Sequence, residues 1–215
     1  MIYKYLQIPK IAKYLFPNSY FVTKNNEILI TFDDSPNIKT TKNILKILNN
    51  YKIQALFFCN GASIQGNEYK ELILEIAQNG HEIGSHSYNH LNLQNLTYKQ
   101  VYYQIQKNNL ILEDILNKRI RYFRAPYGRF LNCSLMKILK DLKLVNVMWS
   151  LMSYDYLGDL NLTKKIIQQK IKSNSIVVFH DNNKTIDNIE EILKFFIEEI
   201  HKKELKIGDV KGCLK

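Results

Sequence analysis

Two histidines and an adjacent pair of aspartates could together bind a divalent metal. His86 and His90 are four residues apart, and Asp33 and Asp34 follow an apolar run. Two imidazole nitrogens and one carboxylate oxygen make a three-ligand site, which leaves a coordination position open for water. The other aspartate would then be free to act as a base beside the metal. Zinc suits this ligand set, and cobalt or manganese could replace it, because the order of affinities alone does not fix the metal.

Each half of this pattern also has an interpretation without chemistry. An Asp-Asp pair after an apolar run is often only a turn. Two histidines four residues apart often only share one face of a helix. The interpretation as a metal site therefore depends on whether the rest of the chain brings these residues together.

The composition is that of an ordinary globular domain. The 215 residues are 46% hydrophobic and 23% charged, which suits one domain with a sizeable core. The sequence has no run of 18 or more apolar residues, so it predicts no transmembrane span. The three cysteines are an odd number without a Cys-x-x-Cys pair, which argues against a disulfide framework and against a thiolate zinc site.

The formal net charge of +10 comes mostly from lysine, which supplies 26 of the 30 basic residues. No nucleic-acid-binding motif accompanies this charge, so we expect no nucleic-acid partner. All four arginines lie between residues 119 and 129. In a lysine-rich chain, this restriction suggests a need there for the planar guanidinium group. The sequence leaves the oligomeric state open.

The beginning of the chain is expected to be an arm of residues 1–26, followed by one domain over 27–210 and a tail over 211–215. An apolar face of this arm could be formed by Leu6, Ile11, Tyr14 and Leu15. Lysines interrupt the apolar residues and no small-residue cleavage site follows, so the sequence predicts no secretory signal. We therefore expect an uncleaved protein that is cytoplasmic or peripheral to a membrane, unless its function places it in the cell envelope.

Apolar runs alternate with helical patterns along the chain. Runs rich in β-branched and aromatic residues predict strands at 28–32, 53–59, 81–84, 121–124, 144–150, 175–179 and 205–210. Apolar residues three and four positions apart predict helices around 44–51, 72–77, 97–116 and 189–200. Helix starts are expected at Thr40-Thr41, Thr97 and Asp187. This alternation predicts a single α/β domain with a barrel-like sheet.

Polar residues follow most of these strands. They are Asp33 and Asp34 after the first strand, His86 and His90 after the third, Arg124 after the fourth, Asp155 beyond the fifth and His180 at the end of the sixth. In a parallel α/β barrel the carboxyl ends of all strands meet on one face, where chemistry is assembled. We therefore expect these side chains to be neighbours in space.

Four segments in this order resemble the motifs of the polysaccharide deacetylases, the NodB-homology domain of carbohydrate esterase family four. They are Thr-Phe-Asp-Asp-Ser-Pro at 31–36, Ser-His-Ser-Tyr-Asn-His at 85–90, Arg-Ala-Pro-Tyr-Gly at 124–128 and Val-Phe-His-Asp at 178–181. The resemblance covers about residues 27–200. It implies a distorted (β/α)7 barrel and metal-dependent removal of N-acetyl groups from amino sugars. The expected partner is an acetylated amino-sugar polymer or oligomer, such as peptidoglycan or a chitin-like oligosaccharide.

The resemblance also implies roles for the matched residues. The ligands of the metal, most often zinc, would be Asp34, His86 and His90. Asp33 would be the general base and Arg124 would hold it. His180 would protonate the departing amine, and Asp155 would orient His180. The backbone N–H of Tyr127 would stabilise the oxyanion. The residues that contact the substrate would be Pro126, Tyr127 and Tyr156.

One further motif of the family, between the last two of these segments, departs from the usual pattern in this chain. Asp-x-x-Asp-Trp is replaced by a segment in which Met152 stands for the first aspartate and Tyr156 for the tryptophan. Tyr156 preserves an aromatic wall for the substrate, whereas Met152 removes a charge. Ser35 also replaces a usual glycine. These departures concern substrate range and rate rather than reaction type, and the form over residues 153–156 resembles a Bacteroidetes-type variant of the family.

Two other functions remain compatible with these residues. The same barrel can open cyclic amides, and a barrel that has lost catalysis could still bind carbohydrate. Pure binding needs neither a free base nor an acid. The presence of both Asp33 and His180 therefore favours an enzyme.

Overall fold

A computed structural model of the chain describes residue 16, residues 18–129 and residues 133–215. The apolar face expected of Leu6, Ile11, Tyr14 and Leu15 lies outside these residues. Among the described helices, none is both long enough and apolar enough to cross a membrane.

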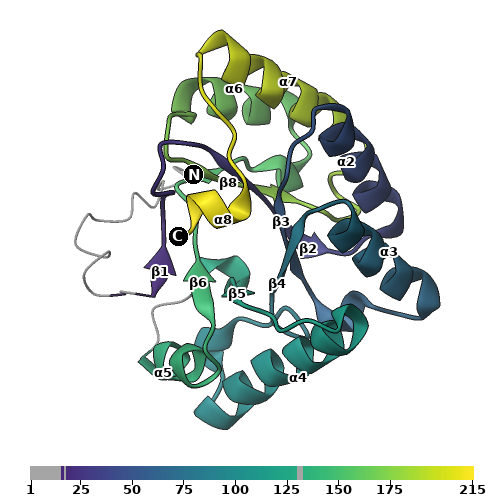
Figure 1. Ribbon diagram of the computed structural model, residues 1–215, viewed down its shortest axis with the longest axis vertical. Coiled ribbons are helices and arrows are strands. Elements are labelled where there is room, and N and C mark those ends of the chain that lie inside the picture. The colour runs from purple at the N-terminus through teal and green to yellow at the C-terminus, as the bar shows by residue number, and fades with distance from the viewer. Residues whose placement is uncertain (1–15, 17, 130–132) are drawn as a thin grey trace.

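Eight parallel strands form one curled sheet with the order β1-β6-β5-β4-β3-β2-β8-β7. The strands are β1 (Ser19–Tyr20), β2 (Leu29–Ser35), β3 (Leu56–Cys59), β4 (Glu82–Ser85), β5 (Tyr122–Phe123), β6 (Val145–Val147), β7 (Leu151–Met152) and β8 (Ile176–His180). Helices surround the sheet (Figure 1). The central strand β2 is buried along almost its whole length, as is usual for parallel strands that are covered on both faces. The expected α/β class and distorted barrel are confirmed, in the form of an open half-barrel.

The helices include the four that the apolar spacing predicts. They are α2 (Ile38–Asn50), α3 (Asn67–Gln78), α4 (Tyr98–Leu116), α5 (Cys133–Asp141), α6 (Leu160–Lys170), α7 (Ile189–Lys202) and α8 (Val210–Cys213), with short 3-10 turns η1 (Gly61–Ser63), η2 (Leu93–Asn95), η3 (Pro126–Gly128) and η4 (Asp155–Leu157). The start of α4 at Thr97 is confirmed, because Thr97 and Gln100 form a reciprocal capping box.

Two predicted helix starts are wrong. Helix α2 is capped by Asn37, whose side chain accepts a hydrogen bond from the backbone N–H of Thr40, and not by Thr40-Thr41. An asparagine three residues earlier competes well for this position, because its side-chain oxygen reaches the first free N–H groups. Helix α7 begins after Asn188 without a side-chain cap, so Asp187 does not cap it.

The run at 144–150 is not one strand, which changes the strand count from seven. It gives β6, which pairs with β5 and β1, and the chain then leads on to β7, which pairs with β8 at the other edge of the sheet. The backbone N–H of Met148 donates to Tyr20 O, and that of Ser150 donates to Ile176 O. Residues 148–150 therefore span the gap between the two edges of the sheet.

Both ends of the described chain pack into the domain. Strand β1, within the expected arm, lies beside β6. The predicted strand at 205–210 is reduced to a single bridge between Ile207 and Ile28, and the chain then turns into α8. Val210, Cys213 and Leu214 cluster with inward residues of the strands, and α8 lies over the middle of the sheet (Figure 1). The described parts of the expected arm and tail thus belong to the packed structure.

Candidate metal and catalytic site

The end of β2 turns both aspartates toward the same space. Neighbouring residues of a regular strand point to opposite faces, but Asp34 has a left-handed backbone with φ of 70°. The pairing of β2 with β3 also shifts register between Phe32 and Ser35. A left-handed backbone costs a residue other than glycine roughly 1–2 kcal/mol, and such strain gathers at functional sites. Here its effect is to bring two adjacent carboxylates into one site.

The three expected metal ligands lie together. One oxygen or nitrogen from each of Asp34, His86 and His90 lies within 4.8 Å of the other two. His90 Nε2 is 3.2 Å from Asp34 Oδ1, and His86 Nε2 is 3.9 Å from the same oxygen. The two histidines lie in the loop after β4 and not on a helix, so the interpretation as a shared helix face is wrong. Carboxylate and imidazole donors at this spacing fit a divalent transition metal.

The proton on His86 is fixed by its neighbour. His86 Nδ1 lies 2.8 Å from the backbone oxygen of Arg124. A carbonyl oxygen only accepts hydrogen bonds, so Nδ1 carries the proton and the lone pair of Nε2 faces the ligand cluster. The strand ends make this contact possible, because the N–H of Arg124 donates to Ser85 O, directly before His86.

Titration of the ligands also suits metal binding. Burial acts to raise the pKa of Asp34, but the neighbouring histidines and the hydrogen bond from Asn182 outweigh it, so this pKa lies below its ordinary value. Burial lowers the pKa of His90, and the neighbouring His86 acts in the same direction because two protonated imidazoles would repel each other. Both shifts favour the forms that ligate metals, a carboxylate and a neutral imidazole.

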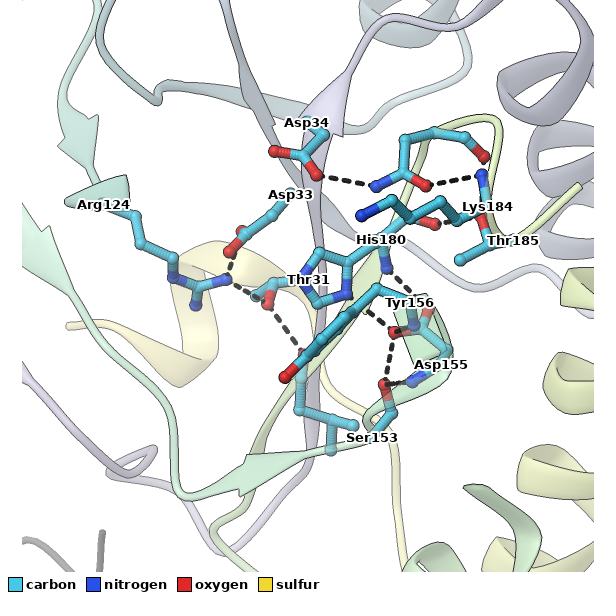
Figure 2. A network of polar contacts seen from close by, with 12 residues as sticks. Thr31, Asp33, Asp34, Arg124, Ser153, Asp155, Tyr156, His180, Lys184 and Thr185 are labelled. Atoms are coloured by element: carbon cyan, nitrogen blue, oxygen red, sulfur yellow. Dashed lines mark hydrogen bonds and ion pairs between the residues drawn. The ribbon is translucent and has the colours of Figure 1, made fainter. Parts of the chain in front are cut away.

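Asp33 is held by a buried arginine and is not one of the three clustered ligands. Arg124 Nη1 donates to Asp33 Oδ1 at 2.7 Å, while Asp33 Oδ2 lies 3.8 Å from His86 Nε2. The guanidinium is fully buried and also donates to Thr31 Oγ1 (Figure 2). Two further hydrogen bonds go to the backbone oxygens of Val147 and Met148. A planar group with several donors is needed to serve these acceptors together, which explains an arginine in a lysine-rich chain.

His180 faces Asp33 across two paired strands. The two residues are register partners of β8 and β2. His180 Nδ1 lies 2.7 Å from Asp155 Oδ1, and the backbone N–H of His180 donates to Asp155 Oδ2 (Figure 2). Burial acts to lower the pKa of His180, but the charge and hydrogen bond of Asp155 outweigh it and raise this pKa to about 9. His180 is therefore a cation at neutral pH, with Nε2 as the nitrogen left for other contacts.

Tyr127 lies at the rim of the site on the turn η3. Its backbone is left-handed with φ of 58°, and its side chain is 64% exposed. The Tyr127 ring meets the ring of His90 edge-on at 4.7 Å. Pro126, before it, is buried and starts the turn. The Tyr127 ring thus lies beside His90, one of the three clustered residues.

Gly128 packs closely against Trp149, and a substitution there is expected to destabilise the fold. A Cβ on Gly128 would lie 2.4 Å from a ring carbon of Trp149, and its φ is +65°. Overpacking costs about 1–3 kcal/mol, in addition to the left-handed backbone. Gly128→Ala should therefore lower the midpoint of urea unfolding. Gly158→Ala is the matched control, because φ there is +75° and no atom lies within 4 Å of a Cβ. Equal losses in the two variants would contradict the close packing.

An open groove of about 2160 Å³ passes over these residues. Its lining includes Asp33, Asp34, His86, His90, Tyr127 and His180. Tyr156 also lines it, and the Tyr156 ring meets the ring of His180 edge-on at 4.8 Å. Pro126 is buried and is not among the lining residues.

Three further residues complete the site, and the sequence did not single them out. Asn182 donates to Asp34 Oδ2 at 2.8 Å. Ser153 Oγ donates to Asp155 Oδ1 at 2.8 Å, and Thr31 Oγ1 accepts from Arg124. Thr31 and Ser153 stand inside recognised motifs, whereas Asn182 directly follows one. Their positions inside a motif or directly after one were the signal available in the sequence.

Comparison with known proteins agrees with the motifs. The family model described as polysaccharide deacetylase matches residues 22–147. The chain is 32% identical over 164 residues to a chitooligosaccharide deacetylase of Azorhizobium caulinodans, covering 74% of this chain and 76% of that protein. It is 29% identical over 213 residues to a peptidoglycan-N-acetylglucosamine deacetylase of Bacillus cereus, covering 95% of this chain and 98% of that protein.

Solved structures share the fold. A peptidoglycan N-acetylglucosamine deacetylase superposes with a TM-score of 0.86 at 23% identity, covering 95% of this chain and 96% of that one. A pseudoenzyme of carbohydrate esterase family four from Bacillus anthracis superposes with a TM-score of 0.80 at 23% identity, covering 92% of this chain and 69% of that one. The same fold thus occurs with and without activity, so the function of a chain depends on its site.

Proposed function

This chain belongs to the polysaccharide deacetylase family, and we propose that it hydrolyses N-acetyl groups of amino sugars in a glycan polymer with the help of a divalent metal. The observation that carries the proposal is the pair of groups beside the ligand cluster. Asp33 is held by Arg124 and stands apart from the three clustered ligands, and His180 is paired with buried Asp155. A protein that only binds carbohydrate needs neither a base nor an acid.

The metal would be held by Asp34, His86 and His90, whose donor atoms fit zinc and also cobalt or manganese. When bound, such an ion polarises a carbonyl group and lowers the pKa of a coordinated water. The fixed proton on His86 Nδ1 keeps the Nε2 lone pair available for this role. Asp34 supplies the single negative charge of the ligand set.

Asp33 would act as the general base. Arg124 binds Asp33 Oδ1, so Oδ2 remains to take a proton from the attacking water. The water oxygen then bonds to the acetyl carbon and the carbonyl oxygen becomes an oxyanion. The backbone N–H of Tyr127, held in its turn, would donate to that oxygen.

His180 would act as the general acid. Its Nδ1 is engaged by Asp155, so the proton that it delivers is the one on Nε2. Transfer of this proton to the amide nitrogen allows the C–N bond to break, because an unprotonated amide nitrogen is a poor leaving group. The products are acetate and a free amino sugar.

The substrate that we propose is an acetylated amino-sugar polymer, either peptidoglycan or a chitin-like oligosaccharide. The open groove and the exposed ring of Tyr127 suit a chain of sugars. The relative that matches nearly the whole chain is named for N-acetylglucosamine of peptidoglycan. Tyr156, beside His180, would provide the wall against the acetyl group or sugar.

Metal removal provides the direct test of this function. The intact chain is expected to release acetate from acetylated glycans, to lose this activity after chelation, and to regain it when zinc is added back. Acetate is measured for peptidoglycan, chitin oligosaccharides and a small cyclic amide as the comparison substrate. Release from no glycan in the zinc-loaded protein would contradict the proposal, and hydrolysis of the cyclic amide alone would assign the chain to the other reaction.

A further inference from the structure

Asn182 donates a hydrogen bond to Asp34 but has no catalytic role in the proposed reaction. Asn182 Nδ2 lies 2.8 Å from Asp34 Oδ2, whereas Asp34 Oδ1 is the oxygen that faces His90 and His86. We propose that Asn182 is a positioning residue that fixes the Asp34 carboxylate with Oδ1 toward the metal. This inference rests on the proposed metal site and concerns how that site is tuned.

The orientation of the Asn182 amide follows from a second contact. Asn182 Oδ1 accepts a hydrogen bond from the backbone N–H of Lys184 at 2.9 Å. A backbone N–H can only donate, so the amide oxygen must be on that side and the NH₂ group must face Asp34. Both ends of the Asn182 amide are therefore engaged. If the amide were flipped, its oxygen would face the Asp34 carboxylate, and its NH₂ group would face the N–H of Lys184.

The loop that carries Asn182 is itself tied to the end of the sheet. Thr185 Oγ1 lies 2.8 Å from His180 O and 3.0 Å from Asn182 O, and Thr40 Oγ1 lies 3.2 Å from Asn182 O. Figure 2 shows Lys184 and Thr185 in the loop that follows His180. The backbone N–H of Asp181 donates to Asp33 O at 2.7 Å. The loop that carries Asn182 is thus anchored to β8, to β2 and to helix α2.

A fixed donor matters because the Asp34 side chain is partly open to solvent, at 20% exposure. Without a partner on Oδ2, the carboxylate could rotate and offer either oxygen, or both, to the metal. Groups that hydrogen-bond to metal ligands typically change metal affinity by about 10–100-fold. We expect a loss of this size when the Asn182 amide is removed.

The test compares two neighbouring asparagines in the intact chain. Asn182→Leu keeps a similar volume and removes the donor. Asn183→Ala is the matched control, because Asn183 is exposed and accepts from Asn37 Nδ2 at 2.8 Å without a hydrogen bond to Asp34. The dissociation constant for Zn²⁺ is measured by competition with a chromophoric chelator, and the visible spectrum of the Co²⁺ protein reports ligand geometry. Asn182→Leu should weaken zinc binding by roughly 10–100-fold and shift the cobalt bands, while Asn183→Ala should match the wild type in both.

Circular dichroism of the metal-free proteins separates lost positioning from misfolding. If the leucine disturbs the loop, Asn182→Ala provides the same comparison with a smaller side chain. Wild-type zinc affinity and an unshifted cobalt spectrum in the folded Asn182 variant would overturn this inference alone. Absence of zinc binding in the wild-type protein would overturn the metal site, and the inference with it.

Discussion

Replacing Asp33 with asparagine is expected to lower kcat/KM for deacetylation by about 10²–10⁴-fold, the usual effect of losing a general base. The substitution removes the proton acceptor and the negative charge that pairs with Arg124. The new amide would keep an oxygen for Arg124, which also retains its bonds to Thr31 and to two backbone oxygens. Zinc should still bind, because Asp33 is outside the cluster of three ligands. The measurement is acetate release together with a zinc titration.

The matched variant is Asp34→Asn, one position along the chain. It removes a ligand, so we expect metal binding and activity to be lost together. Thermal unfolding of Asp33→Asn shows whether the fold tolerates Arg124 without its partner. An unpaired buried charge can lower the free energy of unfolding by about 3–5 kcal/mol. Loss of zinc from Asp33→Asn as complete as from Asp34→Asn would contradict the role of Asp33 as a base outside the metal site. Stoichiometric zinc in Asp34→Asn would show that Asp34 is not a ligand.

Replacing His180 with alanine is expected to cause a comparable loss, about 10²–10⁴-fold, in amide hydrolysis. An amine leaves with difficulty unless its nitrogen is protonated, whereas an alkoxide of an ester needs less assistance. An O-acetylated substrate of similar shape should therefore be affected less than the N-acetylated one. The ratio of the two losses is the measurement, and equal losses would mean that His180 has a structural role rather than an acidic one.

The pH dependence tests the same residue independently. His180 is active as an acid only when it is protonated, and its pKa is raised to about 9. In the wild type, kcat/KM should fall as the pH rises through about 9, and this alkaline limb should be lost in His180→Ala. In Asp155→Asn, burial would still lower the pKa of His180, but the negative charge of Asp155 would no longer oppose this effect. The limb should therefore move to lower pH, and an unmoved limb would show that another group titrates.

Much of the site could be predicted because its residues lie in short motifs at strand ends. Asp34, His86 and His90 follow strands whose apolar character is evident locally, and parallel strands bring their carboxyl ends to one face. Strands β2 and β8 are parallel neighbours, and their carboxyl ends place Asp33 opposite His180. The types of these side chains and their order along the chain thus determined the candidate chemistry.

Local patterns also determined most of the regular elements. The central strands and helices α2, α3, α4 and α7 are long or strongly periodic, and their burial follows from that periodicity. Strands β1, β5 and β7 have only two residues each, and of these only β5 lies inside a run that predicts a strand. Strand β7 exists because β8 offers it a partner at the open edge of the sheet.

Only the tertiary structure decided how the chain crosses between the two edges of the half-barrel and how the candidate ligands are held. Residues 148–150 cross between the two edges, and the guanidinium of Arg124 reaches the backbone oxygens of Val147 and Met148 near this crossing. Asn182 meets Asp34 across 148 positions of sequence. Periodicity records which face of an element is apolar, but contacts between distant segments depend on the relative placement of whole strands and loops. The sequence therefore determined which groups could react, and the packing of the sheet edges decided which neighbours fix them in place.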